Sequence, residues 1–144
     1  MLEVKKLHAG YGKLSVLHDV NVQVEKGEFV ALIGPNGVGK TTLMRSISGL
    51  LKPTSGSINF LGTDIAGLDA FEVNREGISF ITESGDLFAG MKVSENLNLG
   101  AYTIKDKQKI IDMRNKIYEL FPRLEERRDQ LAGTLSGGER KMLS

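Results

Sequence analysis

Residues 34–41 read Gly-Pro-Asn-Gly-Val-Gly-Lys-Thr and fit the pattern G-x-x-x-x-G-K-[ST] at every fixed position. Glycines allow backbone angles that are closed to other residues, and they let backbone amides approach a ligand closely. The amides of such a loop form a concave set of donors, and a helix that begins at its end points its positive dipole at the same place. The stretch therefore predicts a phosphate-binding loop.

The residue types in this loop suit a nucleotide with bound Mg²⁺. Lys40 supplies a point charge for the β- and γ-phosphates. Thr41 supplies a hydroxyl group that can bind Mg²⁺, which prefers oxygen ligands. The expected phosphate-binding residues are Gly34, Pro35, Asn36, Gly37, Val38, Gly39, Lys40 and Thr41. The loop alone does not identify the class of nucleotide-binding protein, since GTPases, kinases and ATPases share it.

The segments on either side of the loop support this interpretation. Phe29–Ile33 is an unbroken apolar run, as expected of a strand buried on both faces of a sheet. Lys40–Ile47 has apolar residues at helical spacing, and Gly49 is a plausible stop. The order of strand, glycine loop and helix disfavours a chance glycine-rich turn. A Rossmann dinucleotide site is also disfavoured, because the spacing G-x-G-x-x-G is missing from the loop.

The rest of the chain mixes strand and helix patterns, which predicts an α/β fold. Strands are expected at residues 2–7, 16–24, 57–61 and 78–81, the last of them of the buried type. Helices are expected at residues 69–76, from 94, at 106–121 and from 136. The helix at 106–121 carries an apolar stripe of Ile110, Met113, Ile117 and Phe121.

Composition excludes several classes of protein. The 144 residues include 19 Lys plus Arg and 18 Asp plus Glu, and a net charge of +1 argues against a nucleic-acid binder driven by bulk charge. Without cysteine the chain has no disulfide and no thiol nucleophile. Its longest apolar run, Phe29–Ile33, is far shorter than the about 20 residues that a membrane span requires.

A second glycine motif, Leu-Ser-Gly-Gly-Glu at residues 135–139, precedes the last predicted helix. On its own it is a helix start, because Ser136 and Glu139 have the spacing of a capping box. Together with the phosphate-binding loop it resembles the nucleotide-binding subunit of ABC transporters. In that family L-S-G-G-[QE] is the signature motif, which contributes to the ATP site of a partner subunit. The resemblance implies that Ser136, Gly137 and Gly138 contact the partner's γ-phosphate.

The resemblance also implies a fold and a division of the chain. The expected fold is the N-terminal part of an α/β P-loop NTPase core, with an antiparallel β edge and the start of a helical subdomain. The β-subdomain and P-loop core would span residues 1–82, the Q-loop and helical subdomain 83–135, and the start of the signature helix 136–144.

Three further residues receive roles from the resemblance. Tyr11 stands where the family places an aromatic ring that stacks on adenine, the alternative being an ordinary strand tyrosine. Thr42 matches a position that helps to hold the phosphates. Glu83 falls where most members carry the Q-loop glutamine, so we expect it to bind Mg²⁺ and to act with Lys40 in catalysis. Glutamate keeps an oxygen ligand but changes the charge, and the alternative is a surface loop acid.

The closer resemblance is to the branched-chain amino acid uptake subset. It is carried by residues 2–12, by the glutamate at 83, by the segments 95–97 and 100–102, and by residues 118–124. Residues 84–86 read Ser-Gly-Asp where that subset would have arginines. This departure weakens the assignment of the transported substrate more than the assignment of the nucleotide.

The function implied is the coupling of ATP and Mg²⁺ binding, and of ATP hydrolysis, to transport. Two such subunits, identical or different, would act on transmembrane permease subunits from the cytoplasmic face of the cell membrane. The family's catalytic Asp and Glu end an apolar strand after the signature motif, and residues 1–144 contain no such run. We therefore expect a shortened domain that is inactive in hydrolysis alone. The alternatives are a truncated non-hydrolysing nucleotide-binding module and a non-transport ABC ATPase.

Overall fold

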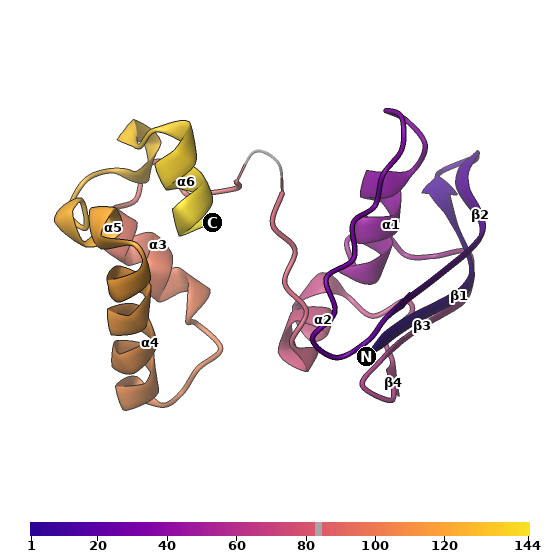
Figure 1. Cartoon of the computed structure of the whole chain (residues 1–144), viewed down its shortest axis with the longest axis horizontal. Coiled ribbons are helices and arrows are strands. Elements are labelled where there is room, and N and C mark those ends of the chain that lie inside the picture. Colours follow the sequence, from indigo (N-terminus) through magenta and orange to yellow (C-terminus); the bar gives the residue numbers. More distant parts are fainter. Residues whose placement is uncertain (83–84) are drawn as a thin grey trace. The chain divides into compact units, whose positions relative to one another are not determined.

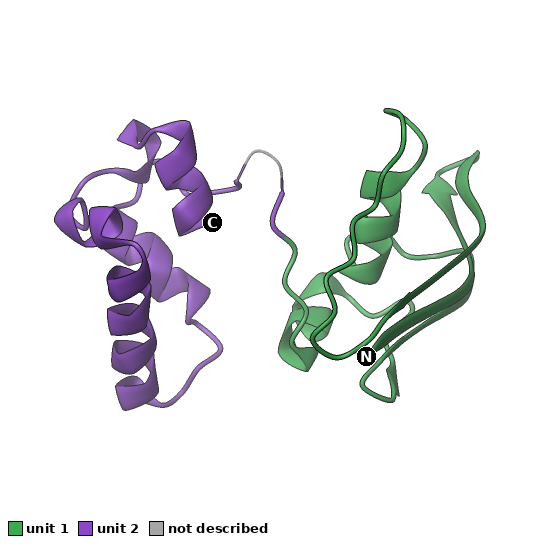
Figure 2. Ribbon diagram, in the orientation of Figure 1, with its two compact units in different colours: residues 1–80 green, residues 81–144 purple. Residues whose placement is uncertain are grey.

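The computed structural model describes residues 1–82 and 85–144 (Figure 1). The chain divides into two compact units, residues 1–80 and 81–144 (Figure 2). Each unit contains its own cluster of buried apolar side chains. Glu83, the predicted Q-loop residue, lies outside the described residues.

The first unit contains a four-stranded antiparallel sheet. Its strands are β1 (Leu2–Tyr11), β2 (Leu14–Val24), β3 (Ser55–Phe60) and β4 (Thr63–Asp64), in the order β2-β1-β3-β4. The sheet is the expected antiparallel edge. In β1, Val4 pairs with Val22 of β2 on one side and with Ile58 of β3 on the other.

A bulge in β1 decides which of its residues face the core. Val4 and Leu7 are three positions apart, so strict alternation would place them on opposite faces of the sheet. The register with β2 shifts between them, and Lys6 has a φ of 46°. The backbone amide of Lys6 donates to Asn21 Oδ1 at 2.9 Å. Because an extra residue in a bulge reverses the alternation, both Val4 and Leu7 are buried.

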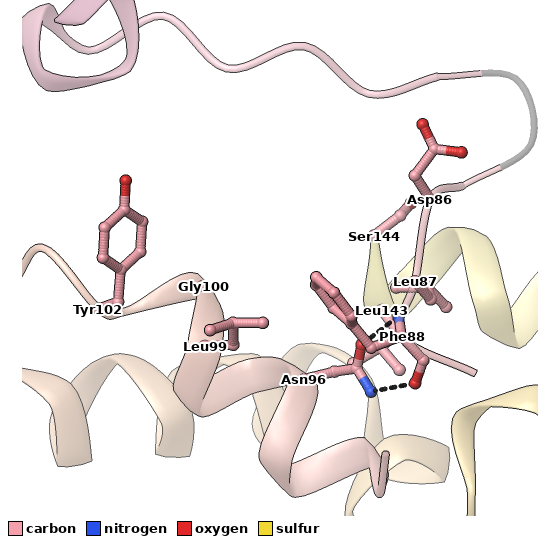
Figure 3. Close-up of a pocket in the computed structure, with 9 residues that line it drawn as sticks. All are labelled: Asp86, Leu87, Phe88, Asn96, Leu99, Gly100, Tyr102, Leu143 and Ser144. Atoms are coloured by element: carbon pink, nitrogen blue, oxygen red, sulfur yellow. Dashed lines mark hydrogen bonds between the residues drawn. The ribbon is translucent and has the colours of Figure 1, made fainter. Parts of the chain in front are cut away.

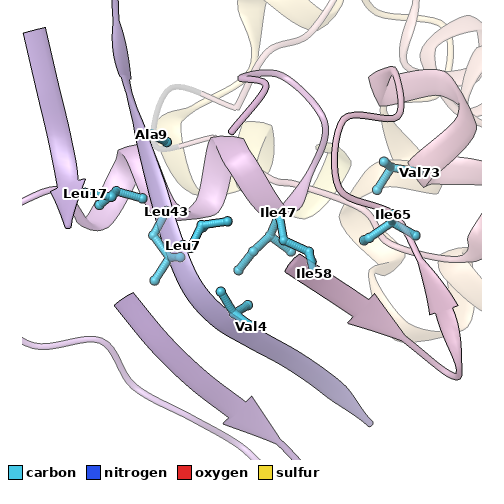
Figure 4. Close-up of a cluster of buried hydrophobic side chains, with 9 residues drawn as sticks. All are labelled: Val4, Leu7, Ala9, Leu17, Leu43, Ile47, Ile58, Ile65 and Val73. Carbon is cyan, nitrogen blue, oxygen red and sulfur yellow. The ribbon is translucent and has the colours of Figure 1, made fainter. Parts of the chain in front are cut away.

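The core of this unit lies between the sheet and two helices, α1 (Lys40–Ile47) and α2 (Ala70–Glu76) (Figure 4). Its members are Val4, Leu7, Ala9, Leu17, Leu43, Ile47, Ile58, Ile65 and Val73. The predicted bounds of α1 are confirmed. The N-terminus of α2 is fixed by a capping box between Asp69 and Glu72.

Two strands predicted from apolar runs are wrong. Residues 29–33 and 78–81 have no regular secondary structure, and Phe29 and Ile33 are each 93% exposed. Ile78 is partly buried against the first core, whereas Ile81 is 62% exposed. An apolar run indicates a preference for burial, but a strand also needs a neighbour to pair with. Within residues 1–82 and 85–144, no strand pairs with either segment.

The second unit is helical. Its helices are α3 (Val93–Gly100), α4 (Lys107–Leu120), α5 (Pro122–Glu126), the 3₁₀ turn η1 (Ala132–Thr134) and α6 (Gly137–Leu143). Their core consists of Val93, Tyr118, Leu124, Ala132, Leu135 and Leu143. The predicted helices from 94, at 106–121 and from 136 are therefore present within one or two residues. None of the helices in the described part of the chain combines the length and apolar character that a bilayer crossing requires.

The apolar stripe predicted along α4 is correct only at its C-terminal end. Ile117 and Phe121 pack against the second core, but Met113 is 46% exposed. The buried residue of α4 is Tyr118, whose long side chain reaches the cluster from the neighbouring position. Pro122 begins α5, a position where its missing amide hydrogen costs nothing.

Candidate nucleotide-binding site

The glycine loop ends where α1 begins, as the sequence pattern requires. Gly39 is the N-cap of α1, and no side chain caps the first turn. The first helical bond runs from the amide of Leu43 to the carbonyl of Gly39. The amides of Lys40, Thr41 and Thr42 precede that bond, so they have no acceptor within the helix. They form a set of donors at the positive end of the helix dipole.

Gly39 lies so close to β2 that an added side chain would force Leu17 to shift. Its φ is 102°, and a Cβ atom built there would lie 2.8 Å from Leu17 Cδ2 and 3.3 Å from Val16 Cγ1. The loop therefore rests on a buried residue of the sheet. This contact fixes the start of α1 relative to β2.

We predict that Gly39→Ala weakens binding of ATP–Mg²⁺ by about tenfold, because alanine in a left-handed conformation costs about 1–2 kcal/mol and the clash moves the loop. Val38→Ala is the matched control, since Val38 is 56% exposed and keeps its backbone amide. Titration calorimetry on both variants checks this. Equal affinities for the two would show that the loop conformation does not matter.

The Lys40 side chain lies on the loop. Its Nζ donates to the carbonyl oxygens of Gly34 and Pro35, both at 2.7 Å. The ammonium charge is thus held beside the loop amides, within the predicted phosphate-binding stretch. An anion bound by those amides would meet this charge, which can exchange its carbonyl partners for phosphate oxygens.

Thr41 and Thr42 face different surroundings. Thr41 is exposed at the start of α1, whereas Thr42 is buried. Within the described residues, no group of three or more His, Cys, Asp or Glu side chains is placed to hold a metal ion. A Mg²⁺ ion bound chiefly through nucleotide phosphates and water needs only one or two protein oxygens. The Thr41 hydroxyl fits such a role, but Thr42 would act through its backbone amide.

Tyr11 is brought to α1 by the end of β1. Its hydroxyl oxygen accepts a hydrogen bond from Arg45 Nη1 at 3.4 Å, and 43% of the residue is exposed. Hydrogen bonds with Thr42 and then with Arg45 lower the pKa of the Tyr11 hydroxyl below its ordinary value. Arg45 is a contact residue that is not predicted from the sequence. No local signal indicates this role, because its partner Tyr11 lies 34 positions away along the chain.

The signature segment, residues 136–138, begins α6 in the second unit. Glu139 N donates to Ser136 Oγ at 3.3 Å, and Ser136 N donates to Glu139 Oε2 at 2.9 Å. The capping box predicted from the sequence is therefore present. Glu139 also pairs with Arg127 Nε at 3.1 Å. Gly137 and Gly138, unlike Ser136 and Glu139, take no part in these contacts. A Cβ atom at either glycine would meet no other atom within 4 Å.

The capping box makes the stability of the second unit dependent on pH. Hydrogen bonds from the backbone and side chain of Ser136 lower the pKa of Glu139. Since the folded pKa is depressed, this stabilisation is present above the ordinary pKa of a glutamate and is lost as pH falls through the folded value. We predict that Glu139→Gln removes this dependence in thermal melts followed by circular dichroism. Glu119→Gln, at an exposed position of α4, should keep it.

A hollow of about 470 Å³ occurs in the second unit (Figure 3). It is lined by Asp86, Leu87, Phe88, Asn96, Leu99, Gly100, Tyr102, Leu143 and Ser144. The backbone amide of Phe88 donates to Asn96 Oδ1 at 3.0 Å, and Asn96 Nδ2 donates to the Phe88 carbonyl at 3.2 Å. These bonds attach the segment before α3 to α3 itself. Phe88 and Tyr102 remain 58% and 66% exposed.

The loop, the helix that follows it and the mixed architecture define a protein of the P-loop NTPase class. The sequence profile described as ABC transporter matches residues 17–144. The chain therefore belongs to the ABC transporter family, which confirms the resemblance drawn from the two glycine motifs.

Relatives from three organisms show where the chain falls in this family. It is 44% identical to the high-affinity branched-chain amino acid transport ATP-binding protein BraG of Pseudomonas aeruginosa and 40% identical to the probable branched-chain amino acid transport ATP-binding protein LivF of Archaeoglobus fulgidus. Each match covers 100% of this chain and 61% of the relative. The sulfate/thiosulfate import ATP-binding protein CysA of Pectobacterium atrosepticum is 34% identical, over 99% of this chain and 44% of its own length.

Solved structures confirm the fold. An ATP-binding subunit of an ABC transporter matches with a TM-score of 0.85 and 34% identity, over 99% of this chain and 58% of its own. A nucleotide-free ATP-binding cassette from an ABC transporter matches with a TM-score of 0.80 and 31% identity, over 99% of this chain and 61% of its own. The α/β P-loop class predicted from the sequence is therefore correct.

Proposed function

We propose that this chain binds ATP with Mg²⁺ through residues 34–42, as part of the ATP-binding subunit of an ABC transporter. The observation that carries the proposal is the start of α1. There, uncapped amides and the Lys40 ammonium converge on one loop. The Thr41 hydroxyl would complete the site as a ligand of Mg²⁺. Glu83 is the proposed second metal ligand and catalytic residue.

We further propose that ATP hydrolysis is not supported by residues 1–144 alone. Phosphoryl transfer to water needs a group that orients the water, and no apolar segment ending in Asp-Glu occurs in these residues. We expect ATP binding without phosphate release above that of Lys40→Ala. A phosphate-release assay on both proteins tests this. Turnover that depends on Lys40 would contradict it and would favour an active ATPase.

A second ATPase subunit, identical or different, is the first proposed partner. Gly137 and Gly138 have open space where a side chain would be, so packing within the chain does not require glycine there. Close approach of a ligand from outside does require it. Contact of these glycines with the γ-phosphate of nucleotide bound by the partner would explain both residues.

Permease subunits are the second proposed partner, at the cytoplasmic face of the cell membrane. The hollow beside α3 supports this proposal, because it has the exposed aromatic side chains of Phe88 and Tyr102. Aromatic residues of this kind are enriched at protein interfaces. The hollow lies in the helical subdomain, which the family resemblance predicts to face the membrane partner.

Branched-chain amino acids are the proposed cargo, because the two branched-chain amino acid transport proteins are more similar to this chain than the sulfate importer is. A chimeric protein tests the cargo. In it, this chain replaces the 145-residue matching segment of the Pseudomonas relative, and the chimera is produced in a Pseudomonas strain from which that relative has been deleted. Restored leucine uptake is the expected result. No uptake by a chimera that is produced and binds ATP would contradict the cargo assignment.

A further inference from the structure

The hydroxyl group of Tyr11 is held by two side chains of α1, although the residue is partly open to solvent. Arg45 Nη1 donates to it at 3.4 Å, and the Thr42 side chain forms the other hydrogen bond. Both partners come from α1, 31 and 34 positions away along the chain. The tip of the ring is therefore fixed, while 43% of the residue stays accessible.

A tyrosine held in this way is a platform for a flat aromatic ligand. Stacking loses less entropy when the ring already has one orientation. The helix that fixes the ring is also the helix that begins at the phosphate-binding loop. At a rise of about 1.5 Å per residue, Arg45 lies about 7–8 Å along the axis from Lys40. One rigid element thus sets the position of the ring relative to the loop.

We propose that Arg45 is a positioning residue that holds Tyr11 as the stacking surface for the base of the bound nucleotide. Arg45 then sets the affinity for the base and leaves the affinity for the phosphate tail unchanged. This inference rests on the proposed function, because it requires a nucleotide in the loop. It goes further by assigning base recognition to a contact between β1 and α1.

The competing explanation is that Arg45 only stabilises α1. It lies in the last turn of that helix, where a cation interacts favourably with the dipole. A purely stabilising role would change ATP binding and phosphate binding together, through the folded fraction of the protein. The two roles therefore differ in what they do to a ligand without a base.

The test is titration calorimetry of the full chain with two probes, ATP–Mg²⁺ and tripolyphosphate–Mg²⁺. Arg45→Met and Tyr11→Phe should each weaken ATP binding by about 2- to 10-fold, the range of one hydrogen bond, and leave tripolyphosphate binding unchanged. Tyr11→Ala should weaken ATP binding by about 5- to 100-fold, since it removes the stacking surface. Arg75→Met, the same change on α2 of the same unit, should alter neither affinity.

A double variant and a pH titration provide independent readouts. In the Tyr11→Ala background, Arg45→Met should have no further effect on ATP affinity. Ultraviolet titration of the tyrosines should show the pKa of Tyr11 rising towards its ordinary value in Arg45→Met.

Three results would overturn the inference. One is an equal loss of affinity for ATP and for tripolyphosphate in Arg45→Met. Another is a loss of ATP affinity on Arg45→Met that is as large in the Tyr11→Ala background as in the wild type. Wild-type ATP affinity in Arg45→Met would do the same. Wild-type protein that binds neither probe would contradict the proposed function itself, and this inference with it.

Discussion

Replacement of Lys40 with alanine is expected to weaken binding of ATP–Mg²⁺ by about 10- to 150-fold, which corresponds to about 1.5–3 kcal/mol for a hydrogen bond to a charged group. The reason is the position of the ammonium, which donates to two carbonyl oxygens of the loop itself. Titration calorimetry at fixed ionic strength measures the change.

Lys26→Ala is the control for Lys40→Ala. Lys26 is an exposed lysine in the turn after β2, so its removal changes the net charge by the same amount. We expect its ATP affinity to equal that of the wild type. An equal loss in both variants would show that bulk charge, rather than the loop, attracts the nucleotide. Circular dichroism of each variant confirms that it is folded.

The largest effect on stability is expected for Leu7→Ala. Leu7 is fully buried in the first core, at the position that the bulge in β1 turns inward. Removing such a side chain costs about 2–5 kcal/mol, from the lost transfer energy and the cavity that remains. This is a large part of the total for a domain of ordinary stability. Urea denaturation, with hydrogen exchange of the β1 and β3 amides, measures the loss.

Leu14→Ala is the matched control for Leu7→Ala. Leu14 is the first residue of β2 and is 66% exposed. Its truncation should change the free energy of unfolding by less than about 0.5 kcal/mol. If both variants lost the same stability, the buried cluster on the sheet would not be the core of the first unit.

Features specified by neighbouring residues could be predicted from the sequence. The bounds of α1 follow from the glycine before it, the helical spacing of Leu43 and Ile47, and the stop at Gly49. The capping box at Ser136 and Glu139 is equally local, since both partners lie within one turn. In each case the interacting groups are a few positions apart, so the pattern contains the whole interaction.

Features that depend on distant partners could not be predicted. Phe29–Ile33 has the composition of a buried strand, but whether it pairs is decided by other strands. The bulge at Lys6 inverts the alternation of β1, and the glycine that lies against it, Gly56, is on β3, about 50 positions away. The bond from Arg45 to Tyr11 joins positions 34 apart, and no local pattern indicates it.

In the candidate site, too, local features could be predicted from the sequence and features that depend on distant residues could not. The start of α1 after the glycine loop and the place of Lys40 beside that loop could be predicted, because these residues are consecutive. Thr42 is a predicted phosphate-binding residue whose side chain is buried and bonds to Tyr11, which leaves that role to its backbone amide. The direction of a side chain on a helix depends on what packs against that helix, which the motif does not contain.

Binding of a triphosphate by the backbone amides of residues 34–42, apart from Pro35, underlies the proposed function. It is tested most directly by the amide resonances of the isotope-labelled chain during addition of ATP–Mg²⁺. We expect the largest shifts at Gly37, Gly39, Lys40 and Thr41, and smaller shifts at Tyr11 and Arg45. A folded chain whose amides at 34–42 stay unchanged at saturating ATP–Mg²⁺, or shift less than those elsewhere, would contradict it.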